Sequence, residues 1–285
     1  MPARTIGEYH SAITSASKSV LLELMTILKS YREFIVVIGG WVPYFLLEAH
    51  RPEEVDFAHV GSIDIDLVIN PDVIDEAKYE TIARMLLKRG YEPSKEILYQ
   101  FERIVRSDID GREYTVGIDF LTPQPPKGQR RTHRHRQIQP DLRARNLKGA
   151  EIALELNQKV SLVGILPGDG KTELDFKMAS LASFFALKGF AFGERYREKD
   201  AYDIYALCDY YKEGPVSVAE EIRPKREIDI VKRGLNAIRN RFRSPEAEGP
   251  SWVVNFMAIV DEKEKEEMRR RSFMVVNETL KNLEV

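Results

Sequence analysis

The chain has 285 residues, of which 43% are hydrophobic and 31% are charged, and its formal net charge is −2. A chain of this length can bury a substantial core and is expected to form two domains. It has no run of about 18 apolar residues and no signal-peptide pattern, which favours a cytoplasmic protein without a membrane span. The only cysteine is Cys208, so the sequence excludes a disulfide framework, a cysteine-based zinc site and thiol catalysis.

The first half of the chain alternates predicted helices and strands. Apolar periodicity predicts a helix over residues 9–31 and a strand over residues 34–38. The strand runs into Gly39-Gly40 and then into a helix with Pro43 in its first turn. This succession is typical of a phosphate site, because glycines let phosphate oxygens approach the backbone and the N–H groups at a helix start attract anions. A tight turn is the alternative interpretation.

The next predicted strand, over residues 63–69, carries two acids in an otherwise apolar run. Asp64 and Asp66 would share one face about 7 Å apart, while the alternate residues line a core. Two carboxylates so placed repel one another unless a cation joins them, and Mg²⁺ prefers oxygen ligands. The pattern therefore indicates a metal site, against the alternative of an edge strand with a solvated polar face.

Downstream, the sequence predicts a helix over residues 76–89 and strands over 98–106 and 114–121. Asp119 is the only charged residue of the last strand, and Gly117 lies two residues earlier on the same face. A third carboxylate is therefore expected beside an open strand face. The alternative is a strand-end aspartate that is bonded to a loop.

A basic segment follows these strands. Between Lys127 and Lys148 there are eight Lys and Arg residues and one acid, Asp141. Such density can neutralise phosphates, which makes the segment a candidate RNA contact. The alternative is a solvated loop, since no aromatic residue within the segment could stack on a base. The candidate nucleic-acid contacts are Arg130, Arg131, Arg134 and Arg136.

The second half of the chain is predicted to be helical. Pro167–Lys171 resembles part of a P-loop, but Gly164 is one residue too far from Gly170-Lys171-Thr172, so a turn is predicted. The predicted domains are therefore an α/β domain over residues 1–172 and a helical domain over 173–285. The expected helices cover residues 176–190, 199–211, 218–240, 252–259 and 263–283.

Taken in this order, the motifs resemble the nucleotidyltransferase superfamily, and within it the AbiEii/AbiGii-type toxin family of toxin–antitoxin and phage-defence systems. The family pattern is Gly-Gly at a helix start, Ser-x-Asp-x-Asp, a lone strand Asp, a lysine and Lys-Asp-x-x-Asp. The matching residues are Gly39, Gly40, Ser62, Asp64, Asp66, Asp119, Lys188, Lys199, Asp200 and Asp203. The resemblance implies an α+β fold: a small mixed β-sheet with flanking helices, followed by a mostly α-helical C-terminal domain.

The resemblance also implies a reaction, in which a nucleoside monophosphate moves from an NTP such as ATP to an acceptor and diphosphate is released. Two Mg²⁺ ions would be held by Asp64, Asp66 and Asp119, and Asp119 could also serve as the general base. The nucleotide would be bound by Gly39, Gly40, Ser62, Lys188 and Lys199. Asp200 and Asp203 would act in catalysis or nucleotide orientation. The alternative is a purely structural role, in which Lys199 and Asp203 form an i to i+4 ion pair.

The sequence leaves three functions open. The first is a toxin that modifies RNA, for example a tRNA 3′ end, or another macromolecule, and the resemblance implies a cognate antitoxin as partner. The second is small-molecule nucleotidyl transfer of the antibiotic-modifying kind, which predicts an acidic acceptor pocket and leaves the basic segment without a purpose. The third is a non-catalytic nucleotide- or RNA-binding module, against which the presence of all three carboxylates argues.

Overall fold

The computed structural model describes residues 5–71, 80–125, 134–168, 170–194 and 196–284. The chain divides into two compact units. The sheet unit comprises residues 11–39 and 62–180, and the helical unit comprises residues 1–10, 40–61 and 181–285. The domain boundary after residue 172 stays a prediction, and the division found in the structure differs from it mainly in assigning residues 40–61 to the helical unit.

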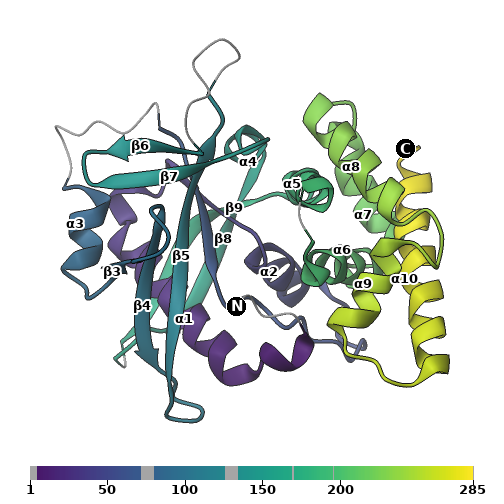
Figure 1. Cartoon of the computed structure of the whole chain (residues 1–285), viewed down its shortest axis with the longest axis horizontal. Coiled ribbons are helices and arrows are strands. Elements are labelled where there is room, and N and C mark those ends of the chain that lie inside the picture. The colour runs from purple at the N-terminus through teal and green to yellow at the C-terminus, as the bar shows by residue number, and fades with distance from the viewer. Residues whose placement is uncertain (1–4, 72–79, 126–133, 169, 195, 285) are drawn as a thin grey trace. The chain divides into compact units, whose positions relative to one another are not determined.

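A mixed β-sheet forms the centre of the sheet unit, with strand order β3-β4-β5-β2-β1-β9-β8. Figure 1 labels β3, β4, β5, β9 and β8 of this sheet. Strand β5 also pairs with β7, which pairs with β6. Parallel pairs (β1 with β9, β2 with β5, β5 with β7) alternate with antiparallel ones. The strands are β1 Ile35–Ile38, β2 Ile65–Ile69, β3 Glu92–Pro93, β4 Gln100–Arg106, β5 Glu113–Pro123, β6 His135–Gln139, β7 Leu142–Leu147, β8 Asn157–Ile165 and β9 Lys171–Ala179.

Helix α1 (Ser11–Ile27) packs on one face of this sheet. Its Glu23 accepts a hydrogen bond from Arg103 Nε at 3.0 Å, and Arg103 is paired with Val116 across β4 and β5. Since residues alternate between faces, Val116, Ile118 and Phe120 point to the side of α1, where all three are fully buried. Gly117 and Asp119 therefore lie on the opposite face. The other helices of this unit are α3 Ile82–Leu87 and α4 Glu151–Glu155.

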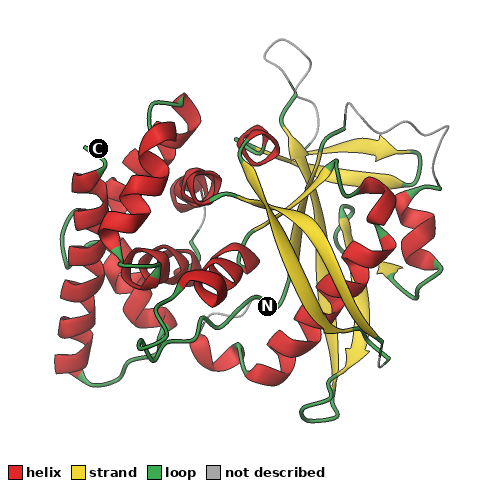
Figure 2. Ribbon diagram, turned by 180° about the vertical axis from the view of Figure 1, so that it is seen from behind, coloured by secondary structure: helices red, strands yellow, loops and turns green. Residues whose placement is uncertain are grey.

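The helical unit is built around α6, in which every residue from Lys199 to Cys208 is buried. Helices α2, α5, α9 and α10 pack against it. In the part of the chain that the structure describes, no helix is both long and apolar enough to span a bilayer. Figure 2 shows these helices in red. They are α2 Trp41–His50, α5 Leu181–Glu194, α6 Glu198–Tyr210, α7 Pro215–Ile222, α8 Asp229–Arg241, α9 Glu248–Phe256 and α10 Glu262–Asn282.

The structure confirms the predicted fold class, a mixed sheet with flanking helices followed by C-terminal helices. The strands predicted over 34–38, 63–69, 98–106 and 114–121 correspond to β1, β2, β4 and β5. The helix predicted over 76–89 is described only in part, because residues 76–79 lie outside the described ranges, and its described portion is α3.

Two element predictions for the second half of the chain are wrong. The segment that begins the helix predicted over 176–190 belongs to β9, and α5 begins only at Leu181. Strand β9 is held in the sheet by both β1 and β8, so tertiary pairing decided its conformation. The helix predicted over 218–240 is two helices, α7 and α8, because Pro224 interrupts the backbone hydrogen bonding between them.

Candidate active site

Two of the predicted carboxylates are brought together by the parallel pairing of β2 with β5. Asp66 lies directly opposite Asp119 in this pair. Paired residues on adjacent strands project from the same face, so both carboxyl groups lie on the sheet face that α1 does not cover. The two acids are far apart in the sequence, and only the strand order makes them neighbours.

Asp119 is surrounded by groups that shift the pKa of its carboxyl group. Gln100, its partner on β4, donates a hydrogen bond from Nε2 to Oδ1 of Asp119 at 2.7 Å. Burial, together with the charges of Asp66 and Asp64, raises the pKa of Asp119 to about 7, although the hydrogen bond from Gln100 opposes the rise. A carboxyl group with a pKa near 7 can exchange a proton at neutral pH, as a general base must.

Glycines lie directly beneath the other two carboxylates. A Cβ at Gly117 would lie 3.4 Å from Oδ1 of Asp64 and 3.0 Å from Nε2 of Gln100. Gly39 has a φ of +77°, and a Cβ at this position would overlap Oδ2 of Asp66 and lie 3.1 Å from its Cγ. Both glycines therefore provide space that the carboxyl groups occupy, and at Gly39 the backbone conformation also favours glycine.

The Gly39-Gly40 pair connects β1 to the start of α2, as the sequence predicts for a phosphate site. Gly40 is the N-cap residue of this ten-residue helix, and no side-chain cap is made at this end in the described structure. The N–H groups of the first turn are thus available to an anion. Ser62, the residue expected to share in phosphate binding, is 8% exposed and precedes β2.

The helical unit contains a buried network of charges that joins α5 to α6. Lys188 donates hydrogen bonds to Asp200 Oδ1 at 2.5 Å and to Asp203 Oδ2 at 2.8 Å. Lys199 binds Asp203 Oδ1 at 2.7 Å, so the i to i+4 ion pair considered for these two residues is present. Burial would raise the pKa of Asp203, but the charges of Lys188 and Lys199 outweigh it and hold this pKa well below its usual range. Each buried charge of the four residues therefore has a partner of opposite charge, and removal of one partner would leave an uncompensated buried charge.

His59 is a member of this network that the sequence did not reveal. Its Nδ1 accepts a hydrogen bond from the Gly61 N–H at 3.1 Å, so its Nε2 carries the proton and donates to Asp203 Oδ1 at 3.1 Å. Burial lowers the pKa of His59 to about 4, which keeps the ring neutral at pH 7. The one available signal was its position three residues before Ser62, and a lone histidine carries no pattern.

The described part of the basic segment is a hairpin, β6 and β7, and not a loop. Arg130 and Arg131 lie outside the described residues. Arg134 immediately precedes β6, and Arg136 is paired with the fully buried Ala144. Arg145 also belongs to the basic segment, although it is not one of the four candidate nucleic-acid contacts. It lies near enough to Asp119 for its positive charge to lower the pKa of that carboxyl group.

A comparison with known families identifies the family of the chain. The model of the family "Nucleotidyl transferase AbiEii toxin, Type IV TA system" matches residues 55–264, which is most of the chain. The chain belongs to the AbiEii family. No curated protein and no solved structure matches it. The match includes the three carboxylates and the buried charge network of this AbiEii protein, whereas Gly39 and Gly40 precede the matched residues.

The carboxylates of this AbiEii protein fit a hard divalent cation by the chemistry of their donors. Asp64, Asp66 and Asp119 offer only carboxylate oxygens, which Mg²⁺ prefers over nitrogen or sulfur. The mutual repulsion that raises the pKa of Asp119 is the unfavourable term that a cation would relieve. As they stand, the described residues contain no group of three or more His, Cys, Asp and Glu side chains placed to hold a metal ion.

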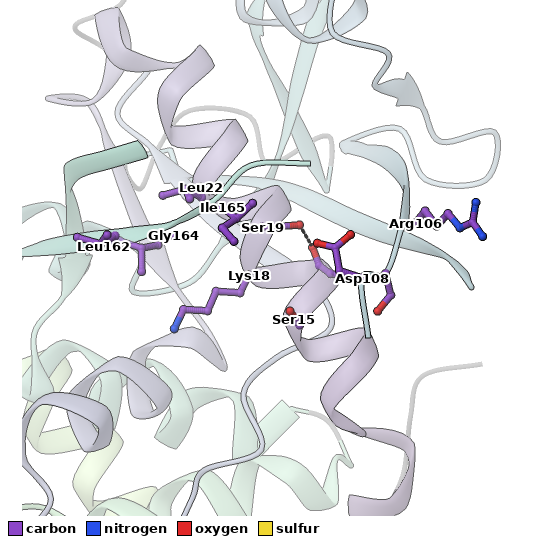
Figure 3. Close-up of a pocket in the computed structure, with 12 residues that line it drawn as sticks. Ser15, Lys18, Ser19, Leu22, Arg106, Asp108, Leu162, Gly164 and Ile165 are labelled. Carbon is purple, nitrogen blue, oxygen red and sulfur yellow. Dashed lines mark hydrogen bonds between the residues drawn. The ribbon is translucent and has the colours of Figure 1, made fainter. Parts of the chain in front are cut away.

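A separate cavity of about 260 Å³ lies on the α1 side of the sheet unit (Figure 3). It is lined by α1, by the turn between β4 and β5, and by the end of β8. Lys18, Arg106 and Asp108 are its charged residues, and none of the three carboxylates of the AbiEii site borders it. We therefore assign the AbiEii chemistry to the opposite face.

Proposed function

We propose that this AbiEii protein transfers a nucleoside monophosphate from an NTP to a hydroxyl group of RNA. The pairing of Asp66 with Asp119 on neighbouring parallel strands, with Asp64 on the same face, is the observation that carries this proposal. The acceptor oxygen bonds to the α-phosphorus, the bond from that phosphorus to the β-phosphate oxygen breaks, and diphosphate leaves. The proton of the acceptor hydroxyl passes to Asp119, the carboxylate directly opposite Asp66.

Asp64, Asp66 and Asp119 would also hold the two Mg²⁺ ions that the resemblance implies. When bound, such ions lower the pKa of an attacking hydroxyl and neutralise charge on the phosphates. Gly39 and Gly40 would receive the β- and γ-phosphates at the start of α2, together with Ser62. The position of both glycines at the start of α2 supports this role.

In the helical unit we assign nucleotide orientation to Lys188, Lys199, Asp200 and Asp203. Their burial and mutual hydrogen bonds support a role in which the network holds its members in fixed positions. Membership of a Type IV toxin–antitoxin family further supports an antitoxin as the partner that controls the protein in the cytoplasm.

The test is incubation of the protein with each α-labelled NTP, Mg²⁺ and bulk tRNA. We expect label in the RNA, no label without Mg²⁺, and a loss of at least about a hundredfold in Asp64→Ala and Asp66→Ala. Glu113→Gln, at the exposed far end of β5, is the matched control and keeps its rate. Label on a small amino compound would show that the acceptor is a small molecule and not RNA. NTP binding by wild type without turnover would indicate a non-catalytic binding module.

A further inference from the structure

We propose that Arg145 and Tyr99, with Arg143 beside them on β7, form the subsite that binds the RNA acceptor next to Asp119. This inference rests on the proposed function and adds the place and the chemistry of acceptor binding. Along one edge of β5, the first part of the strand pairs with β4 and the last part pairs with β7 (Figure 1).

Strand β4 pairs with β5 as far as Gln100 opposite Asp119, and β7 pairs with β5 from Arg145 opposite Leu121. At the junction, the Phe120 N–H donates to the Tyr99 carbonyl at 2.9 Å. The guanidinium of Arg145 lies over the ring of Tyr99, 5.6 Å from its centroid. An Arg and an aromatic ring are thus held together beside the acid that we assign as the proton acceptor.

The register places Arg145 on the carboxylate face. Arg145 is paired with Leu121, which lies two residues after Asp119 and therefore projects from the same side of β5. Arg143 lies two residues before Arg145 on the same side of β7, about 7 Å away along the strand. Arg143 is exposed, and Arg145 and Tyr99 are each partly exposed, so all three are accessible to a ligand.

The order of strands separates this subsite from the proposed triphosphate site. Across the face, the order is Gly39 at the end of β1, Asp66 on β2, Asp119 on β5 and then Arg145 on β7. A triphosphate at the glycine side and an acceptor at the arginine side would place the reacting phosphorus over the carboxylates between them. This is the arrangement that in-line transfer needs, because the acceptor and the leaving diphosphate must be on opposite sides of the phosphorus.

An RNA chain fits the subsite better than a second nucleotide does. The backbone spacing of about 7 Å between Arg143 and Arg145 is close to the spacing of successive phosphates in an extended RNA chain, and it is wider than that of adjacent phosphates in one triphosphate. The ring of Tyr99 offers a face on which a base can stack, the element that the basic segment alone lacks. Arg145 would contact a phosphate by paired N–H donors.

The experiment measures label transfer to bulk tRNA by Arg145→Gln, Tyr99→Leu and the control Arg112→Gln, which changes an exposed arginine in the turn between β4 and β5. We expect Arg145→Gln and Tyr99→Leu to raise the KM for tRNA roughly tenfold. The KM for NTP should stay within about twofold, because the triphosphate binds elsewhere. Arg112→Gln should match wild type. A rise in the KM for NTP alone would make Arg145 a triphosphate ligand and overturn the proposal.

Direct binding of fluorescent tRNA without NTP separates this inference from the proposed function. If the subsite exists, Arg145→Gln weakens binding and lowers the salt dependence by about one ion, even if no label is ever transferred. Equal affinity of wild type, Arg145→Gln and Tyr99→Leu, or no tRNA binding by wild type, would overturn the proposal. Since Arg145 lies in β7 and Tyr99 in the turn before β4, a folding defect in one variant, detected by circular dichroism, leaves the other to decide.

Discussion

At the scale of single residues, His59 and Asp119 have pKa values that burial shifts in different directions. Burial favours the neutral form of each, so the pKa of His59 falls to about 4 and that of Asp119 rises to about 7. For His59, the unfolded chain binds the proton first on acidification, so stability is lost between pH 6.5 and 4. For Asp119, the folded protein binds the proton first, so stability is gained as pH falls below about 7.

The first prediction is that His59→Gln removes the acid-dependent loss of stability that His59 causes. Glutamine can donate to Asp203 as Nε2 does, but it cannot be protonated. We expect the free energy of unfolding of wild type to fall relative to that of the variant by roughly 3 kcal/mol between pH 7.5 and pH 4. Urea unfolding at several pH values measures the difference, in which the contribution of Asp119 cancels.

His10→Gln, which replaces an exposed histidine, is the control for this comparison and should follow the wild-type pH dependence. Parallel stability curves for wild type and His59→Gln would contradict the assignment of His59 as a buried neutral histidine. Asp203 also lowers stability as the pH approaches the ordinary pKa of 3.8 of the unfolded chain, but this contribution is common to wild type and His59→Gln and is expected to cancel in their difference.

At the scale of secondary-structure elements, the connection from β1 to α2 depends on Gly39. The second prediction is that Gly39→Ala is more harmful than the same change at Gly168, although both glycines have positive φ. At Gly168 nothing lies within 4 Å of an added Cβ, so only backbone strain of about 1 kcal/mol is expected. At Gly39 the Cβ would also displace the carboxylate of Asp66.

Thermal unfolding and label transfer test this pair of variants. Gly39→Ala should lose at least about 1 kcal/mol more than Gly168→Ala and should lower the transfer rate at least tenfold, since a displaced carboxylate is costly to catalysis. Equal stability and equal rates for the two variants would show that Gly39 serves only the turn.

The third prediction concerns the close crossing of α5 and α8. A Cβ at Gly234 would lie 2.6 Å from the Cα and 2.7 Å from the carbonyl oxygen of Ala186. Alanine is the better helix former by about 1 kcal/mol, so a net loss of stability must come from crowding. We expect Gly234→Ala to lose about 2 kcal/mol or more by chemical denaturation, and Arg239→Ala, an exposed change in α8, to lose less than about 0.5 kcal/mol.

At the scale of the whole molecule, the helical unit is discontinuous in sequence. Residues 40–61 belong to it, and they pack on α6 and the residues that follow. The ring of Phe57 stacks on Tyr210 with centroids 3.8 Å apart, and the Lys212 N–H donates to the His50 carbonyl at 3.1 Å. Part of the core around the C-terminal helices is therefore supplied by residues 40–61, from the first half of the chain.

The fourth prediction is that a fragment of residues 173–285 does not fold cooperatively, because it lacks α2 and the loop that follows α2. Joining residues 40–61 to 181–285 through a flexible linker should restore a helical circular dichroism spectrum with a cooperative thermal transition. A cooperative transition in the fragment of residues 173–285 by itself would support the domain boundary after residue 172.

Sequence and structure agree where local patterns are strong. The strand pattern around Asp64 and Asp66, the glycine pair before α2 and the apolar stripe of α1 each predict their element, because hydrophobic periodicity and backbone preference act over a few residues. The last residues of β9, from Phe176, were predicted as the start of a helix, although Leu174, Phe176 and Met178 alternate with polar residues. Strand β8 directly precedes β9, but the second partner, β1, is more than 130 residues earlier in the chain, so a short window of sequence did not show that this segment is held in the sheet.

The sequence by itself was sufficient to predict the carboxylate motif, the glycine pair and the α+β fold class, since each depends on patterns of neighbouring residues. Only the tertiary structure decided that Asp66 and Asp119 are partners, that Arg145 stands beside Tyr99, and that His59 joins the buried charges of α6. These relations depend on strand order and on packing between distant segments. The free energy that selects them comes from burial over the whole unit, which no short stretch of sequence contains.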